Sequence, residues 1–273
     1  MIEYCFETVN WSPYFGFANP DVSGMIRAAA DHGFRWISFD LRTIDHYRAR
    51  GGTHQSLRAE LAAFGVKLLA VHSLAVGADI DEVEKLAKPV VEACHALGAH
   101  FLHAGVVAPV DDQVIAATRH AGRMCEAVGV GFAVEFLPFL PVASIAQTRD
   151  LLRASGLKGP GLVVDSWHFF YGPDDWAALE TVTADEIAYI QFDDHGPLPK
   201  GVLSTGADLL AETTQNRVLP GEGRFDLKRF TETLRRTGYD GVVGPEILSA
   251  QLRAQPPGQA AQRIMETTKP YWS

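Results

Sequence analysis

Residues 127–135 of the chain read AVGVGFAVE: the end of an amphipathic run, a glycine, and an apolar, β-rich run that closes on Glu135. A glycine in this place is typical of the residue that ends a helix in the left-handed conformation just before a strand. The pattern recurs at 29–40, 62–72, 96–103 and 236–246. A spacing of about thirty residues corresponds to one strand and one helix per repeat.

Counting outward from these segments gives eight apolar runs that we expect to be strands. They span residues 3–9, 35–41, 67–74, 100–107, 131–137, 161–166, 187–193 and 241–247. Helices are expected near 20–32, 54–64, 81–97, 111–128, 144–155, 174–181, 226–237 and 257–268. Most of the runs are continuously apolar, which is typical of parallel strands covered on both faces. Eight such units with right-handed crossovers predict an α/β fold, a single (β/α)8 TIM barrel.

The alternative fold is an open, doubly wound sheet, and no GxGxxG turn follows any of the expected strands to favour it. The 273 residues could form two ordinary domains or one barrel of about 250 residues. No linker or low-complexity segment divides the sequence, so we expect one domain over 1–273. Its one irregularity is a long connection at about 194–225, rich in Gly, Pro and Thr. We interpret it as a functional loop insertion over the barrel mouth.

Composition argues against several classes of protein. The formal net charge is −9, which disfavours binding to nucleic acid or to an anionic membrane surface. Cys5, Cys94 and Cys125 are an odd number at wide spacing, so we expect buried thiols in a reducing compartment. The first residues show no signal peptide, and no apolar stretch reaches the ~18 residues of a membrane span. We therefore expect a cytoplasmic protein.

Four consecutive strands of the expected barrel end in a carboxylate or an amide: Glu135, Asp165, Gln191 and Glu246. Catalytic groups of such barrels lie at the carboxyl ends of the strands. Three converging carboxylates would repel one another unless a cation neutralised them. An oxygen-rich set with one amide suits one divalent ion, Mg²⁺ or Mn²⁺ before Co²⁺ or Zn²⁺. The alternative is that some of these are solvated loop residues or structural ion pairs.

Further polar candidates lie close to these strand ends. His168 follows Asp165 by three residues and could lean over the site as a substrate ligand or proton carrier. Arg217 precedes a Gly-rich turn and could orient a substrate oxygen. His72 and His103 also end strands, although a strand-end histidine is as often a satisfied core residue. The run Asp193-Asp194-His195 could coordinate something, but crowding after a strand end is common.

Aromatic residues gather just after the expected strands. The set is Trp11, Phe15, Phe136, Phe139, Trp167, Phe169, Phe170 and Tyr171. Together they could form an apolar collar that excludes water and packs on a carbon face of a substrate. The alternative is that they pack the loops onto one another.

At these residues the sequence resembles the xylose-isomerase-like TIM barrels, a superfamily of sugar isomerases and epimerases, keto-inositol dehydratases, dehydroshikimate dehydratases and endonuclease IV. Glu135 in VEFLP matches the family's strand-end glutamate, and Asp165 with His168 matches its Asp-x-x-His motif. Gln191 stands at the third metal position, which is His in the ketose 3-epimerases. Arg217 with PGEG matches the Arg-x-x-Pro-Gly-x-Gly turn, and Glu246 the last ligand.

The resemblance implies one divalent metal ion held by Glu135, Asp165, Gln191 and Glu246. It implies an isomerase or epimerase of a ketose or keto-polyol, in which one glutamate removes a proton beside a metal-polarised carbonyl to give an enediolate. In an epimerase, Glu135 and Glu246 would take and return that proton from opposite faces. If the enediolate expelled a β-hydroxyl instead, the protein would be a dehydratase, a lyase of a dehydroshikimate-like or keto-inositol-like ring, with His168 as the acid.

The implied partner is a small-molecule carbohydrate or cyclic polyol. The residues expected to bind it are Arg217, His168, His72, His103, Trp11, Trp167 and Phe136. Two other functions compete: an abasic-site nuclease, disfavoured by the acidic balance and the single-metal ligand set, and a barrel that only binds a sugar, for which two flanking carboxylates are unnecessary. Homodimers or tetramers are common in relatives of this kind, so the resemblance implies a homo-oligomer.

Overall fold

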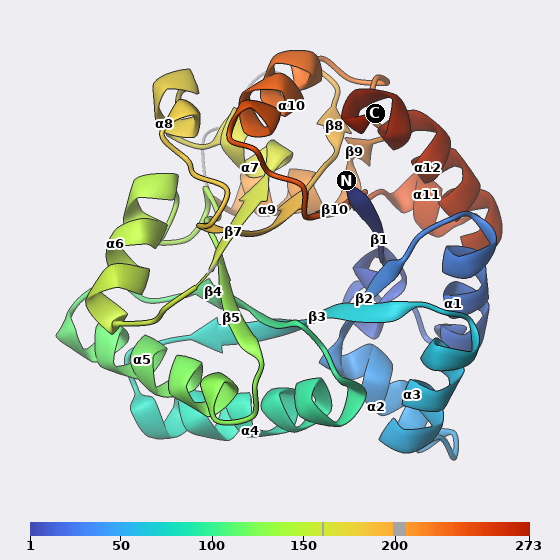
Figure 1. Cartoon of the computed structure of the whole chain (residues 1–273), viewed down its shortest axis with the longest axis horizontal. Helices are drawn as coiled ribbons and strands as arrows, with labels where there is room; N and C mark the ends of the chain where they lie inside the picture. The colour runs from blue at the N-terminus through green and yellow to red at the C-terminus, as the bar shows by residue number, and fades with distance from the viewer. Residues whose placement is uncertain (160, 199–205) are drawn as a thin grey trace.

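The computed structural model describes residues 1–159, 161–198 and 206–273. Eight parallel strands close into a barrel, in the order β1-β10-β7-β6-β5-β4-β3-β2. They are β1 (Glu3–Glu7), β2 (Trp36–Asp40), β3 (Lys67–Val76), β4 (Phe101–Val106), β5 (Gly131–Glu135), β6 (Leu162–Asp165), β7 (Ile187–Gln191) and β10 (Val242–Gly244). Helices surround the ring of strands (Figure 1). The predicted (β/α)8 TIM barrel is confirmed.

The barrel closes between the first and the last strand along the chain. Glu3 and Tyr4 of β1 pair with Val242 and Val243 of β10, and β1 pairs with β2 on its other side. Because parallel strands of a closed barrel present their carboxyl ends at one mouth, the last residue of each strand reaches the same end of the molecule.

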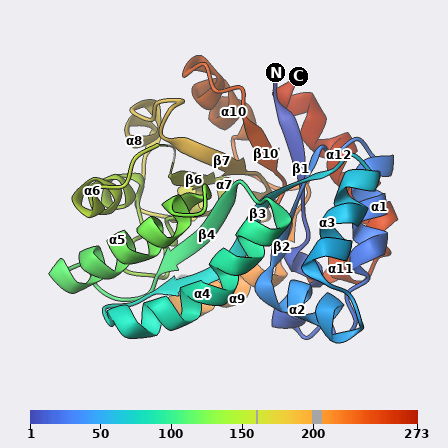
Figure 2. The same ribbon diagram turned by 60° about the horizontal axis from the view of Figure 1, so that its bottom comes forward.

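Most of the helices lie around the outside of the strands, and α9 lies at one end of the barrel (Figures 1 and 2). The helices are α1 (Val22–Asp31), α2 (Leu41–Ala49), α3 (His54–Ala63), α4 (Ile80–Leu97), α5 (Asp112–Glu126), α6 (Ile145–Ser155), α7 (Ser166–Tyr171), α8 (Trp176–Glu180), α9 (Gly206–Gln215), α10 (Leu227–Arg236), α11 (Ala250–Arg253) and α12 (Pro257–Trp272). Two 3-10 turns, η1 (Val9–Trp11) and η2 (Pro13–Phe15), follow β1. Each of the eight expected helices is present, and Gly98 ends α4 in the left-handed conformation (φ 72°).

Two helices that the sequence did not predict begin on the residue directly after a strand. Asp40 ends β2, and its carboxylate accepts the backbone N–H of Thr43 to cap α2 (3.1 Å). Asp165 ends β6 and caps α7 in the same way through the N–H of His168 (3.1 Å). A side-chain acceptor at this position satisfies one of the free donors of a helix start, so no connecting loop is needed.

The connection predicted over 194–225 is more ordered than expected. It contains β8 (Asp194–His195), α9 and β9 (Arg217–Val218), with β8 and β9 antiparallel; residues 199–205 lie outside the described ranges. The Asp194 carboxylate accepts the backbone N–H groups of Gly221, Gly223 and Phe225, each at 3.0 Å. A Cβ atom on Gly223 would lie 2.1 Å from Asp194 Oδ1, so only glycine fits there. The long connection is therefore present, and it includes one helix and a short pair of antiparallel strands.

The core lies between the strands and their helices, and a smaller cluster around Cys5, Trp36, Leu69 and Tyr189 fills the barrel interior. All three cysteines are buried and free, as predicted. None of the helices within the described ranges has the length and hydropathy of a membrane-spanning segment.

Candidate active site

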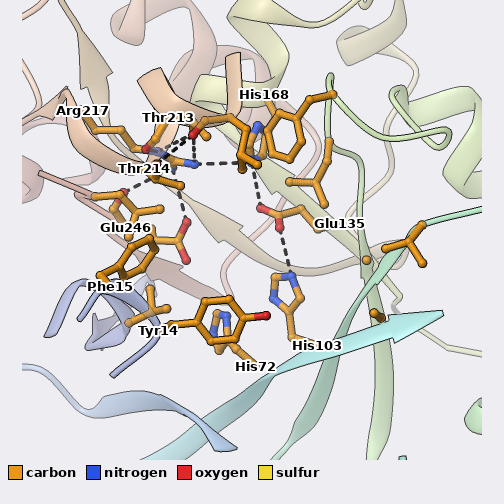
Figure 3. Close-up of a pocket in the computed structure, with 18 of the residues that line it drawn as sticks. Tyr14, Phe15, His72, His103, Glu135, His168, Thr213, Thr214, Arg217 and Glu246 are labelled. Carbon is orange, nitrogen blue, oxygen red and sulfur yellow. Dashed lines mark hydrogen bonds and ion pairs between the residues drawn. The ribbon is translucent and has the colours of Figure 1, made fainter. Parts of the chain in front are cut away.

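A cavity of about 300 Å³ opens among the carboxyl ends of the strands (Figure 3). Its polar lining residues are His72, His103, Glu135, His168, Thr213, Thr214, Arg217 and Glu246. Its apolar lining includes Val9, Tyr14, Phe15, Leu74, Ala75, Val107, Leu137, Phe139, Leu210 and Leu248. The four predicted strand-end histidine and glutamate residues His72, His103, Glu135 and Glu246 thus reach one cavity, together with His168 and Arg217.

Glu135, the last residue of β5, lies between two imidazoles. Its Oε2 is 3.1 Å from His103 Nε2, and its Oε1 is 3.3 Å from His168 Nε2. Burial by itself would raise the pKa of Glu135, but His168 and His103 outweigh it and hold that pKa well below its usual range. Glu135 is therefore ionised and fixed in direction at neutral pH, as a proton acceptor needs to be.

Below Glu135, a chain of buried polar groups crosses the barrel. The Tyr189 hydroxyl bonds to His103 Nδ1, and the His103 ring stacks on His72 with ring centres 4.5 Å apart. His72 Nε2 lies 3.2 Å from Glu7 Oε2. Burial and the charges of Glu7 and Glu135 raise the pKa of Tyr189 well above its ordinary value, so its hydroxyl keeps its proton. We infer that Tyr189 donates to Nδ1, which leaves Nε2–H of His103 to donate to Glu135.

Sequence reasoning missed Glu7 and Tyr189. Their signal is the period of two along a strand: Tyr189 precedes Gln191 by two residues, so both side chains face the barrel interior. Glu7 likewise shares its face of β1 with Cys5. The contacts themselves depend on barrel closure, because Tyr189 and His103 are 86 positions apart in the chain.

Arg217, in β9, reaches across the mouth to three acidic groups. Its Nη1 lies 2.8 Å from Asp165 Oδ2, 2.6 Å from Asp193 Oδ2 and 3.4 Å from Glu246 Oε2. Its Nε and Nη2 donate to Thr213, whose hydroxyl is at 3.1 and 2.8 Å. The side chain is 1 % exposed. Although burial would lower the pKa of Arg217, Asp165 and Asp193 raise it, so the guanidinium is a permanent cation.

This guanidinium divides the predicted metal ligands. Donor atoms of Glu135, Asp165 and His168 lie within 4.8 Å of one another, whereas Glu246 groups in the same way with Glu7 and His72. Gln191 pairs with Asp165 in the β6–β7 register, and among the described residues neither of its buried amide atoms has a hydrogen-bond partner. Asp193, which we expected only loosely to take part, is instead the closest partner of Arg217.

The residues nevertheless fit a divalent cation. Glu7, Glu135, Asp165, Asp193 and Glu246 are all buried, and Arg217 alone among the described Lys and Arg residues is buried with them. Burial, with the neighbouring carboxylates opposing Arg217, raises the pKa of Asp193 and of Glu246 well above the ordinary value. This excess of negative charge, next to the unpaired amide of Gln191, is the environment that a hard or borderline divalent ion satisfies.

Three aromatic residues expected to bind substrate lie outside the cavity wall. Trp11 (1 % exposed) packs against Phe6 in the core, and Phe136 is buried in a second core cluster. Trp167 lies behind the site, with its ring 5.4 Å from that of His168. Tyr14, Phe15 and Phe139 line the cavity instead.

Comparisons with known proteins agree with this architecture. The family model described as xylose isomerase-like TIM barrel matches residues 26–271. Inosose isomerase of Bacillus velezensis is 25 % identical over 272 residues, covering 92 % of each chain. A 3-dehydroshikimate dehydratase of Pseudomonas putida is 28 % identical over 144 residues, 52 % of this chain and 21 % of that protein. A crystal structure of an IolI protein with a bound zinc atom superposes with a TM-score of 0.83 at 21 % identity, covering 99 % of this chain and 98 % of that one.

Proposed function

Because this chain belongs to the xylose isomerase-like TIM barrel family, we propose that it is an isomerase or epimerase of a polyhydroxylated ketone. The observation that carries the proposal is the placement of two buried carboxylates, Glu135 and Glu246, on opposite sides of one cavity (Figure 3). Two carboxylates that flank a substrate can take a proton from one face of a carbon and return it to the other.

The proposal includes one divalent metal ion. Glu135, Asp165, Gln191 and Glu246 would hold it. Donor atoms of Glu135 and Asp165 already lie within 4.8 Å of one another, Gln191 brings an unpaired amide, and Glu246 would exchange its contact with Arg217 for the ion. When bound, such an ion would polarise the substrate carbonyl and make the neighbouring C–H bond more acidic. The IolI crystal structure with a bound zinc atom supports this expectation for the fold, without deciding between zinc, manganese and magnesium here.

The chain's own residues would perform the proton transfer. Glu135, held by the imidazoles of His103 and His168, would remove the proton beside the carbonyl. Glu246, on the opposite wall, would deliver a proton to the other face. Arg217 would keep Glu246 and Asp165 in position. Its positive charge would stabilise the negative charge that develops on the substrate oxygen.

The relatives favour a ring-shaped substrate over an open-chain one. Inosose isomerase, which the chain matches over most of its length, acts by its name on an inosose, a cyclic keto-polyol. We propose a cyclic polyhydroxy ketone of this class, bound with its polar edge toward the buried histidines and glutamates.

A second candidate reaction is dehydration, and one observation favours it. Within the described part of the chain, His168 Nδ1 is buried and has no hydrogen-bond partner. An imidazole with a free nitrogen beside the proton acceptor could protonate a departing hydroxyl group. The match to 3-dehydroshikimate dehydratase, although it covers only half of this chain, is in line with this alternative.

Incubation of the protein with cyclic keto-polyols in D₂O tests the two reactions. We expect deuterium to exchange into the carbon beside the ketone without loss of water, and NMR would monitor this exchange. A new conjugated enone absorbance would instead show the dehydratase. If neither exchange nor absorbance developed with any cyclic or open-chain ketose, the proposed function would be wrong.

The substitution Glu246→Gln distinguishes the role of Glu246 from that of Glu135. It preserves the shape of the side chain but removes its proton, so we expect epimerisation to fall by about 10²–10⁴-fold. Exchange started by Glu135 should fall much less. Equal loss of both activities would contradict separate roles for Glu135 and Glu246.

A further inference from the structure

The cavity has a strong gradient from polar to apolar between its floor and its rim. Its charged and imidazole side chains are all buried; Glu135, the most exposed of them, is 7 % exposed. The most exposed large side chains on its rim are apolar: Tyr14 at 55 %, Val107 at 48 % and Leu210 at 47 %. Only eight large hydrophobic side chains are exposed in the described ranges, and three of them gather at this opening.

These rim residues come from separate parts of the chain. Tyr14 lies in η2, Val107 follows β4, and Leu210 belongs to α9 of the long connection. The half-buried Phe15, Leu137 and Phe139 continue the apolar surface inward. Several segments that are distant in sequence contribute to one exposed apolar collar. This is unusual for a surface that binds no ligand, because exposing each apolar side chain to water is unfavourable.

The aromatic part of the collar is held in place from outside. The guanidinium carbon of Arg42 lies 4.2 Å from the centre of the Tyr14 ring, and that of Arg253 lies 4.7 Å from the centre of the Phe15 ring. Arg253 is itself fixed by the backbone oxygens of Asn10 (2.8 Å) and Thr214 (3.0 Å). Rings fixed in this way present a preformed surface to a ligand, which lowers the entropy cost of binding.

The charged residues described at the cavity do not form an anion site. Among the described residues, Arg217 is the only Lys or Arg that lines it, and the nearest partners of its guanidinium are carboxylates. A phosphate or carboxylate on the substrate would therefore meet Glu135, Glu246 and an apolar rim. The outer part of the substrate is consequently expected to be neutral and apolar.

We propose that the substrate is a cyclic polyhydroxy ketone that carries a neutral aryl substituent, with the hydroxylated ring on the polar floor and the aryl group on the collar of Tyr14, Phe15, Val107, Phe139 and Leu210. This inference rests on the proposed function for the identity of the ring. It adds a specificity site for a substituent that the reaction itself does not require.

The test compares two ligands that differ only in the substituent: the methyl and phenyl glycosides of one keto-hexopyranose, titrated calorimetrically into the full-length protein. We expect the phenyl glycoside to bind at least about tenfold more tightly. The substitutions Val107→Thr and Leu210→Ser should each bring the ratio of the two dissociation constants toward one. Both side chains are exposed, so folding, checked by circular dichroism, should be unaffected.

Matched controls exist for both variants. Val110→Thr and Leu86→Ser change side chains of similar exposure (45 % and 44 %) that do not line this cavity, and they should keep the wild-type ratio. A wild-type ratio near one, a ratio that the rim variants do not change, or no binding of either glycoside would overturn the proposal. Tighter binding of a phosphate ester of the same keto-sugar would overturn it as well.

The same samples distinguish this inference from the proposed function. If deuterium exchange were observed but the two glycosides had nearly equal dissociation constants, the proposed isomerase would be supported and the proposed aryl site would be wrong. If the protein bound the phenyl glycoside tenfold more tightly, the rim variants abolished this preference and no ligand exchanged deuterium, the aryl site would be supported and the proposed isomerase would be wrong.

Discussion

Arg217 brings together more of the site than any other residue. Its Nη1 forms ion pairs with three acidic side chains, and its Nε and Nη2 donate hydrogen bonds to Thr213. Removing one partner of a buried ion pair leaves charges that neither water nor protein neutralises. We therefore expect the residue to be important for stability, apart from the role proposed for it at the substrate.

We predict that Arg217→Met lowers the free energy of unfolding by about 3–5 kcal/mol at pH 7, measured by urea denaturation of chelator-treated protein. Arg217→Lys keeps the charge without the planar fork and should lose less. Without Arg217, the folded pKa values of Asp193 and Glu246, already raised by burial, would rise further above their unfolded values. Stability of the variant should therefore fall as the pH rises from 5 to 7. An unchanged free energy of unfolding would contradict this role.

The hydroxyl of Tyr189 is expected to select the tautomer of His103. In Tyr189→Phe, Nδ1 loses its donor, and the imidazole can then turn its proton away from Glu135. We expect kcat to fall about tenfold with KM nearly unchanged. The ¹⁵N shifts of the His103 ring in two-bond NMR spectra give a reading independent of turnover. A wild-type tautomer in the variant would show that Tyr189 is merely structural.

At the scale of elements, one carboxylate makes three of the hydrogen bonds that hold the turn after β9. Asp194 accepts three backbone N–H groups of this turn, so Asp194→Ala should leave them unsatisfied and cost about 2–4 kcal/mol. Asp194→Asn keeps one acceptor oxygen and should cost less. Faster hydrogen exchange at the amides of Gly221 and Gly223 would locate the change. Exchange as slow as in the wild type would contradict the assignment.

The element boundaries show what sequence patterns can and cannot predict. Glycines followed by apolar runs predicted five of the barrel strands, because a left-handed glycine and a buried parallel strand both leave a local signal. The other three strands were predicted from their apolar runs at the same spacing. α2 and α7 were missed since Asp40 and Asp165 each end a strand and cap a helix at once, which removes the polar loop that normally marks a boundary. α9 was missed because its segment was interpreted as an irregular connection.

The candidate site shows the same division. That Glu135 and Glu246 reach the cavity could be predicted, since polar residues at the ends of buried strands are conspicuous in sequence. Asp165 and Gln191 are buried at neighbouring strand ends, and the role of all four as ligands stays a prediction. The insertion of Arg217 between Asp165 and Glu246 could not be predicted, because it depends on the three-dimensional course of the 206–225 segment. Trp11, Trp167 and Phe136 were expected at the cavity because sequence gives their height along the barrel but not the side to which each turns.

For the whole molecule, the excess of buried carboxylates predicts that divalent ions stabilise the fold. A ligand present at 100 times its dissociation constant adds about 2.7 kcal/mol, which for a chain of this size raises Tm by roughly 5–10 °C. We expect calorimetry to show this rise in Tm after Mn²⁺, Mg²⁺, Co²⁺ or Zn²⁺ is added to chelator-treated protein. In Asp165→Asn the rise should shrink. If none of the four ions raised Tm, the proposed metal site would be wrong.

Of the acidic partners of Arg217, Asp165 ends β6, while Asp193 and Glu246 follow β7 and β10; the three strands are neighbours in the barrel. Two of the proposed cation ligands, Asp165 and Glu246, are thus also groups that attach the 206–225 segment to adjacent strands. An engineer who redesigned these positions for another ion or substrate would at the same time alter how that segment is anchored. Variant libraries at this site should therefore be selected for folding first and for catalysis second.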